Sequence, residues 1–221
     1  MTNKRNGVLC LLTCQGVYDT KLSRFYGEHP EDRPIYDSQL LYAFNHLVWR
    51  KRAKPLLVIS GGLTQRQRRC SESRSYFERT KHLGLPVLGQ VALEEHALTS
   101  IENLILSIYA FHQERGTYPD SIELISWAFK RRRMEKALEA INVWAPLGQS
   151  WPPLRFFPVG DLWGRFKETA VQAEEEDCAA LDHGVEAYYQ SERVQELLRN
   201  RNVFDSRQLA RKAYEGYPLP F

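Results

Sequence analysis

The chain is organised around the stretch Pro55-Leu56-Leu57-Val58-Ile59-Ser60-Gly61-Gly62-Leu63-Thr64. Four consecutive apolar residues, two of them β-branched, lead directly into Ser-Gly-Gly. This pattern is typical of a strand that is buried on both faces and ends abruptly in a turn. Ligands of open α/β sheets bind at such carboxyl ends, where glycines let them approach the backbone amides. The stretch therefore predicts where something binds, without identifying what binds.

Strands and helices are predicted to alternate on both sides of this stretch. Apolar runs of strand length predict four further strands, at residues 7–14, 86–93, 122–128 and 154–157. Amphipathic spacing predicts helices that begin near Asp37, Ser71, Thr99 and Phe129. Strands joined by crossover helices form a largely parallel sheet. The sequence therefore predicts an α/β domain over residues 1–160 and a helical C-terminal extension, residues 161–221, packed on the same domain.

Several segments carry more specific expectations. Asp37 is expected to be the N-cap of the first helix, whose buried stripe would consist of Leu40, Leu41, Phe44, Leu47 and Val48. Residues 19–34 mix charges with glycine and prolines, so an exposed loop is expected there. The acidic run 174–177 is expected to be a solvated helix face. The aromatic and proline-rich tail, residues 214–221, either packs on the domain or hangs free, and composition leaves this open.

The composition argues against several classes of protein. With 43% hydrophobic and 26% charged residues, the chain matches an ordinary soluble globular protein. No run approaches the roughly 18 apolar residues of a membrane span, and Val8–Thr13 is too short for a secretory signal, so it is interpreted as a core strand. A net charge of +3 is too small to indicate a nucleic-acid partner. The four cysteines form no CxxC pair, which predicts free thiols and a cytoplasmic protein.

Polar residues gather at four predicted strand ends, residues 13–18, 60–64, 94–103 and 126–133. In a parallel sheet these ends lie on one edge, which makes that edge the predicted site. The amides and hydroxyls of residues 60–64 would hold an anion, helped by the N-terminus of the helix after Ser71. The cations that follow Phe129 would clamp the anion from the other side. The predicted ligand-binding residues are Gln15, Ser60, Gly61, Gly62, Thr64, Ser100, Asn103, Arg131 and Arg133.

Carboxylates near the same edge are candidates for proton transfer. The predicted catalytic residues are Glu72, Glu95 and Lys130, and Glu94 and Glu102 are further candidate acids. Each motif also has a simpler interpretation: the glycines as a tight turn, the basic run as a solvated face, and Glu102 as a helix cap.

No metal-binding residues are predicted, because His46 and His96 stand apart without metal-ligand spacing. The carboxylates could bind Mg²⁺, but nothing in their spacing indicates it. The chain lacks the GxGxxG, GxxxxGK[ST], HExxH and GxSxG motifs, which argues against the common nucleotide-binding, P-loop, zincin and hydrolase mechanisms.

Four motifs that follow one another along the chain together resemble the YdcF/SanA/ElyC-like family (domain of unknown function 218), especially its eukaryotic cytosolic branch. The motifs are Ser60–Thr64, Ser71–Tyr76, Glu94–Asn103, and Phe129–Lys130 with Arg133. The segment Arg199–Phe204 also resembles that branch. The resemblance implies a Rossmann-like three-layer sandwich. One bacterial member is reported to bind S-adenosylmethionine, and others affect envelope and lipid-carrier metabolism. By position, the resemblance implies a pocket that contains Ser60, Gly61, Gly62, Glu72, Glu95, Ser100, Glu102, Asn103 and Lys130.

The chain departs from this branch at Cys14-Gln15-Gly16, where relatives usually have Gly-His-Ala. If that histidine takes part in the chemistry of the relatives, this chain has lost or changed the reaction. A role dedicated to a specialised metabolic pathway would agree with such a change.

Two functions from different classes fit these residues. The first is an enzyme that binds a small anionic or nucleoside-type ligand, either S-adenosylmethionine or a phosphate-bearing metabolite, and uses glutamate acid/base chemistry. The alternative is a non-catalytic nucleotide or cofactor-binding protein. Glu95→Gln distinguishes the two: in an enzyme turnover would fall while affinity survives, whereas in a binding protein the two would change together or not at all. A third interpretation, nucleic-acid binding through residues 50–54, 66–69 and 130–133, predicts strongly salt-dependent binding. The expected partner is a small molecule, while the cofactor and any homo-oligomer are left open.

Overall fold

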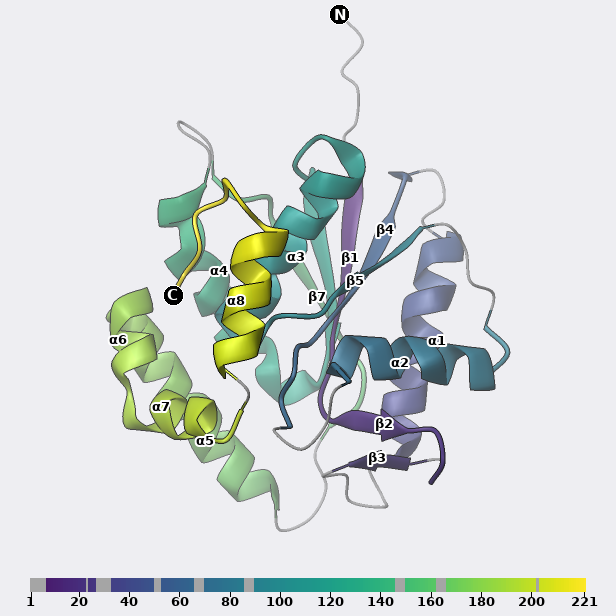
Figure 1. Ribbon diagram of the computed structural model, residues 1–221, viewed down its shortest axis with the longest axis horizontal. Coiled ribbons are helices and arrows are strands. Elements are labelled where there is room, and N and C mark those ends of the chain that lie inside the picture. Colours follow the sequence, from purple (N-terminus) through teal and green to yellow (C-terminus); the bar gives the residue numbers. More distant parts are fainter. Residues whose placement is uncertain are drawn as a thin grey trace, which may run out of the picture.

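The apolar runs of the sequence form a five-stranded parallel sheet with helices on both faces (Figure 1). The computed structural model describes residues 7–22, 24–26, 33–49, 53–65, 70–85, 90–145, 150–161, 166–201 and 203–221. The strands are β1 (Val8–Thr13), β4 (Leu56–Ser60), β5 (Val91–Glu94), β6 (Ser121–Ser126) and β7 (Leu154–Pro158). They lie in the order β5-β4-β1-β6-β7, and every pairing is parallel. The predicted α/β fold with a mainly parallel sheet is confirmed.

Alternate residues of the central strand enter two hydrophobic cores, one on each face of the sheet. Leu9 and Leu11 pack on the side of α3 (Ser100–Arg115) and α4 (Arg131–Ala140). Cys10 and Leu12 pack on the side of α1 (Arg33–Trp49) and α2 (Glu72–His82). Every residue of β4 is buried, as a strand covered on both faces requires. The result is a three-layer sandwich of the Rossmann-like kind.

Two of the helices begin at the caps that the sequence indicates. The Ser71 hydroxyl accepts a hydrogen bond from the Arg74 amide at the start of α2. The Thr99 hydroxyl accepts from the Glu102 amide at the start of α3, which ends at Gly116 in the left-handed conformation. These caps place the first turns of α2 and α3 beside the carboxyl edge of the sheet.

The prediction for α1 is wrong in its start and in part of its stripe. The helix begins at Arg33, so Asp37 lies inside it and its carboxylate pairs with the Arg79 guanidinium at 2.6 Å. Leu41 and Val48 are exposed, by 41% and 55%. The helix turns 100° per residue, so its buried stripe follows the 4-3-4 spacing of Tyr36, Leu40, Ala43 and Leu47 instead.

The segment between β1 and α1 contains a short hairpin in place of the expected exposed loop. It consists of β2 (Val17–Asp19) and β3 (Arg24–Tyr26), which pair antiparallel. Phe25 is buried there against the rings of Tyr18, Tyr36 and Tyr76. Residues 23 and 27–32 lie outside the described part of the chain.

The C-terminal extension packs on the α3 side of the sheet. Its helices are α5 (Phe166–Asp182), α6 (Val185–Gln190), α7 (Glu192–Arg199) and α8 (Val203–Ala213), and α8 runs in front of α3 in Figure 1. The tail also packs on the domain, because the Tyr109 hydroxyl donates to the Pro218 carbonyl and the Tyr217 hydroxyl lies 2.7 Å from a ring nitrogen of His112. Within the described residues, no helix combines the length and the apolar character that a membrane span requires.

Candidate functional site

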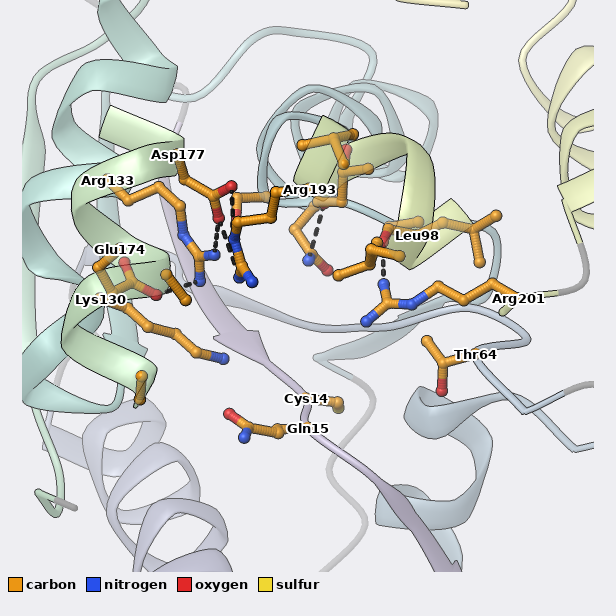
Figure 2. Close-up of a pocket in the computed structure, with 18 of the residues that line it drawn as sticks. Cys14, Gln15, Thr64, Leu98, Lys130, Arg133, Glu174, Asp177, Arg193 and Arg201 are labelled. Atoms are coloured by element: carbon orange, nitrogen blue, oxygen red, sulfur yellow. Dashed lines mark hydrogen bonds and ion pairs between the residues drawn. The ribbon is translucent and has the colours of Figure 1, made fainter. Parts of the chain in front are cut away.

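A cavity of about 670 Å³ opens at the carboxyl edge of the sheet, between the sheet and the C-terminal extension. Residues that directly follow β1, β5 and β6 form one side, and residues of α5, α6 and α7 form the other (Figure 2). The predicted site residues on its wall are Gln15, Thr64, Glu72, Ser100, Asn103, Lys130 and Arg133. The predicted residues that are not among those lining the cavity are Ser60, Gly61, Gly62, Glu95 and Arg131.

The predicted amide cradle at Gly61 and Gly62 is wrong, because both amides have partners within the protein. The Gly61 amide donates to the Glu94 carbonyl at 3.0 Å, and the Gly62 amide donates to the Ala97 carbonyl at 2.7 Å. The glycines serve close packing instead. A Cβ atom at Gly62 would lie 2.7 Å from the Ala97 carbonyl oxygen, and one at Gly61 would lie 2.9 Å from the Cβ of Cys14. The turn therefore holds β4 against the segment after β5.

Glu95 and Arg131 were predicted to act in the site, and both point to other partners. The Glu95 carboxylate pairs with the Arg74 guanidinium at 2.7 Å and accepts from the Ser71 hydroxyl, and these hydrogen bonds hold its pKa below the usual value although partial burial acts in the opposite direction. The Arg131 guanidinium lies over the ring of Phe156 on the outer side of α4. Glu95 is thus an ionised structural partner of α2.

Lys130 brings a positive charge to the cavity wall. Burial is the main cause that lowers the pKa of its ammonium group to about 8, and the neighbouring Arg133 lowers it further. Among the described residues, no carboxylate lies within ion-pair distance of it, and its ammonium nitrogen lies 5.8 Å from the centroid of the Phe129 ring. Figure 2 shows its side chain directed from α4 toward Gln15 and Cys14.

Arg133 also reaches the cavity wall, but its charge is neutralised within the protein. It pairs with Glu174 at 2.9 Å and with Asp177 at 2.5 Å, and Asp177 also binds Arg193 at 3.0 Å (Figure 2). The prediction of a solvated face for residues 174–177 is therefore wrong for Glu174 and Asp177, which are 8% and 3% exposed.

Sequence reasoning missed these residues of the extension, although a signal was present. Glu174, Asp177, Cys178 and Leu181 follow the 3-4-7 spacing of one helix face, and all four are buried. Two acids that share a face with apolar residues indicate buried ion pairs. The remaining missed residues on the wall come from α5, α6 and α7 and from the segment after α7: Thr169, Tyr188, Arg193, Leu197 and Arg201.

Glu72 is another carboxylate that lines the cavity. One of its oxygens accepts hydrogen bonds from the Gly16 amide at 2.9 Å and from the Thr64 hydroxyl at 2.6 Å. Cys14 lies beside it, and burial, together with the charges of Glu72 and Glu94, raises the pKa of the Cys14 thiol well above its usual value. Because the thiolate is the nucleophilic form, Cys14 is not suited to nucleophilic attack at neutral pH.

A separate polar cluster lies under α1, away from the cavity. Ligand atoms of Cys10, His46 and Glu123 lie within 4.8 Å of one another, and His46 pairs with Glu123 at 2.6 Å. The Arg155 guanidinium lies 3.9 Å from the other oxygen of Glu123, where it would compete with a metal ion. The three residues are far apart in the sequence, so spacing could not have shown the cluster.

The basic segments considered for nucleic-acid binding fall largely outside the structure, since residues 50–52 and 66–69 are not among those described. All four cysteines are free thiols, as predicted. The site is characterised by the Lys130 amine, the Glu72 carboxylate, the Arg201 guanidinium that donates to the Leu98 carbonyl, and a buried ion-pair cluster that joins α4 to the extension. In comparisons with protein-family models, curated proteins and solved structures, no match to this chain was found.

Proposed function

We propose that this chain is an enzyme that binds and converts a small anionic metabolite in the cavity at the carboxyl edge of its sheet. The observation that carries the proposal is Lys130, a half-buried side chain on the cavity wall whose ammonium group has no ion-pair partner among the described residues. A charge in such a place is costly unless a partner of opposite sign is bound. The carboxylate or phosphate of a ligand would supply that partner.

The size of the cavity and its other charges support a small ligand. Its volume of about 670 Å³ lies within the range of roughly 300–1,000 Å³ for small-molecule sites. Arg133 and Arg193 are engaged by Glu174 and Asp177, and Arg201 donates to the Leu98 carbonyl, so Lys130 is the group that would bind the anion. The Thr64, Ser100 and Asn103 side chains would orient the rest of the ligand.

Lys130 and Glu72 would also carry the chemistry. A pKa of about 8 lets the Lys130 ammonium give up a proton near neutral pH, which suits a general acid. The Glu72 carboxylate, which also lines the cavity, would accept a proton. The proposed glutamate acid/base chemistry is therefore assigned to Glu72 and not to Glu95.

The ligand class follows from charge. The wall presents four cationic and three carboxylate side chains, which favours a phosphate-bearing metabolite over S-adenosylmethionine, whose sulfonium and ammonium groups outnumber its carboxylate. S-adenosylmethionine is a candidate ligand only because of the family resemblance. Classical methyltransferases hold the ribose with an acid after the second strand, whereas β4 ends in Ser60-Gly61-Gly62.

A thermal-shift screen tests the proposal. The purified chain is heated with nucleotides, sugar phosphates, prenyl phosphates, S-adenosylmethionine and its demethylated product, each with and without Mg²⁺. Because a ligand at about 100 times its Kd stabilises the folded state by about 2.7 kcal/mol, a true ligand gives a clear shift. We expect a shift with a phosphate ligand that Lys130→Met abolishes and Lys130→Arg keeps in part. An equal shift in Lys130→Met would refute the proposed anion site.

A non-catalytic ligand-binding protein is the second candidate. It is favoured by the use of one Glu72 oxygen as an acceptor for Gly16 and Thr64, which is a structural role. Glu72→Gln separates the two functions, with the ligand from the screen. The enzyme proposal expects turnover to fall by about 10²–10⁴-fold while affinity is kept, as removal of a general acid or base does. The binding-protein candidate expects no turnover in the wild type.

A further inference from the structure

The Ser60 hydroxyl, at the end of β4, lies between two oxygen atoms that would both be acceptors if the neighbouring glutamate were ionised. Its Oγ is 2.6 Å from Oε2 of Glu94 and 2.6 Å from Oδ1 of Asn103. A serine hydroxyl carries one proton, so it can donate to only one of them. The second contact needs a proton from the other partner.

The orientation of Asn103 is set by the backbone. Its amide nitrogen donates to the Thr99 carbonyl at 3.0 Å. Turning the amide over would place its oxygen against that carbonyl oxygen and lose the hydrogen bond. Asn103 therefore faces Ser60 with Oδ1, which has no proton to give.

Glu94 is the remaining source of the second proton. Its Oε1 accepts hydrogen bonds from the amides of His96 at 2.7 Å and Ala97 at 3.0 Å, which leaves Oε2 to carry a proton. We propose that Glu94 is a neutral carboxylic acid in the folded protein and that the chain Glu94–Ser60–Asn103 fixes the Asn103 amide as a hydrogen-bond donor on the cavity wall. One hydrogen of the Asn103 nitrogen is used by Thr99, and the other is left for a ligand acceptor.

The surroundings of Glu94 agree with a neutral acid. The side chain is fully buried, and burial raises its pKa to about 7. The titratable groups that face it are Glu102 on α3, Cys14 after β1 and Tyr214 after α8. None of the three is a cation; the hydrogen bonds from the His96 and Ala97 amides favour the ionised form, but burial outweighs them.

Glu102 is a second buried glutamate near the same sheet edge, and its hydrogen-bond partners differ from those of Glu94. Its carboxylate meets only donors: the Leu98 amide at 2.5 Å, the Tyr189 hydroxyl at 3.0 Å and the Arg207 guanidinium at 3.7 Å. Burial raises the pKa of Glu102 as well, but these donors act in the opposite direction and stabilise its negative charge. Two buried glutamates on one sheet edge thus have opposite protonation states, which their hydrogen-bond partners decide.

Glu94→Gln is the direct test, because glutamine reproduces the neutral acid: its oxygen accepts from the two amides and its nitrogen donates to Ser60. The infrared spectra of the wild type and of Glu94→Gln are compared one pH unit below that pKa, at about pH 6. We expect the difference to contain the carbonyl stretch of a protonated carboxylic acid. The same comparison with Glu102→Gln is expected to show an ionised carboxylate. Absence of the acid band from the Glu94 difference would overturn the proposal.

A measurement on the wild type keeps the proposal testable even if a variant folds poorly. The side-chain amide signals of Asn103 are identified by NMR through their loss in Asn103→Asp. When the pH rises through about 7, Glu94 loses its proton and Ser60 turns its own proton to it, so Asn103 loses its donor. We expect the Asn103 signals to shift across this range in the wild type and to stay constant in Glu94→Gln. Constant signals in the wild type would refute the link to Asn103.

The pH dependence of the free energy of unfolding provides an independent test of the raised pKa of Glu94. The folded chain keeps the Glu94 proton up to about pH 7, whereas the unfolded chain loses it near the ordinary value of 4.5. The free energy of unfolding of the wild type therefore falls between these two pH values and levels off above them. We expect the stability of Glu94→Gln relative to the wild type to rise through this window. A flat difference would contradict a raised pKa for Glu94.

Discussion

Lys130 illustrates how a single residue can lower stability while it serves a site. Its pKa is lowered from 10.5 to about 8 mainly by burial, so keeping the ammonium charged at neutral pH costs folding free energy. The α4 helix gains nothing from this charge at its first turn, where the helix dipole opposes a cation. The anionic ligand of the proposed function would supply the opposite charge that offsets this cost.

Lys130→Met is therefore expected to stabilise the protein and to abolish ligand binding. The expected gain is about 1–3 kcal/mol at pH 7, because each pKa unit corresponds to about 1.4 kcal/mol, and the melting temperature rises by about 2–4 °C per kcal/mol in a chain of this size. As the pH rises from 8 toward 10.5, the folded wild type loses the Lys130 proton first and gains stability, so the advantage of the variant shrinks. Scanning calorimetry at several pH values measures this.

Lys81→Met is the matched control, since Lys81 is exposed and its contacts are with Glu78 and the Phe77 ring on the same helix. Its effect is expected within about 0.5 kcal/mol. If Lys130→Met is less stable than the wild type at pH 7, Lys130 is a structural residue and the proposed site loses its main support.

At the scale of elements, the contact between α4 and α5 closes the cavity. Arg133 on α4 is 8% exposed and binds both Glu174 and Asp177 on α5. Replacing buried ion pairs as a set can be neutral, but removing one partner leaves the others buried and unpaired. The contact therefore depends on Arg133 in particular, because it is the partner that the two acids share.

Arg133→Met is expected to lower the free energy of unfolding by about 3–5 kcal/mol, the cost of breaking a buried ion pair from one side. Arg131→Met, two residues earlier on an exposed face of the same helix, is the control and is expected to change it by no more than about 0.5 kcal/mol. Urea unfolding curves of both variants give the comparison. Equal midpoints would show that the α4–α5 contact is solvated in solution.

The strands and most helix starts could be predicted from the sequence because their causes are local. A strand buried on both faces must be a continuous apolar run, as β4 is, and Ser71 and Thr99 cap helices within three residues. The α1 start at Arg33 was missed because Asp37 has the composition of a cap while its carboxylate serves a distant partner, Arg79.

The candidate site was predicted only in part because its remaining causes are long-range. Arg133 and Asp177 are 44 residues apart, so local composition could not distinguish a solvated acidic run from a buried one. The Gly61 and Gly62 amides have the sequence of an anion cradle, but they are consumed by carbonyls of the segment after β5. Residues of the sheet edge were found, and those of the extension were not, since pairing across the sequence decides their roles.

At the scale of the molecule, the extension and the sheet share one hydrophobic core. Leu181, Tyr188, Val194 and Leu198 of the extension belong to the same cluster of buried side chains as Leu104 of α3. Glu102 adds a polar link, since it accepts from Tyr189 and lies 3.7 Å from Arg207. Two parts that share a core and buried polar links gain stability from each other, so neither is expected to open alone.

The chain is therefore expected to unfold in one cooperative transition. Because Trp163 belongs to the extension, the fluorescence is measured in a Trp163→Phe background, where the buried Trp127 and Trp151 report on the sheet side. Cys178 on α5, which is 2% exposed, reports on the extension through its reaction with a thiol dye. We expect both signals to change at the same urea concentration, with the Cys178 component identified by its loss in Cys178→Ala. Labelling of Cys178 at a lower urea concentration than the fluorescence change would mean that the extension detaches first. In that case the cavity would open by release of α5, and ligand binding should raise the urea concentration at which Cys178 reacts.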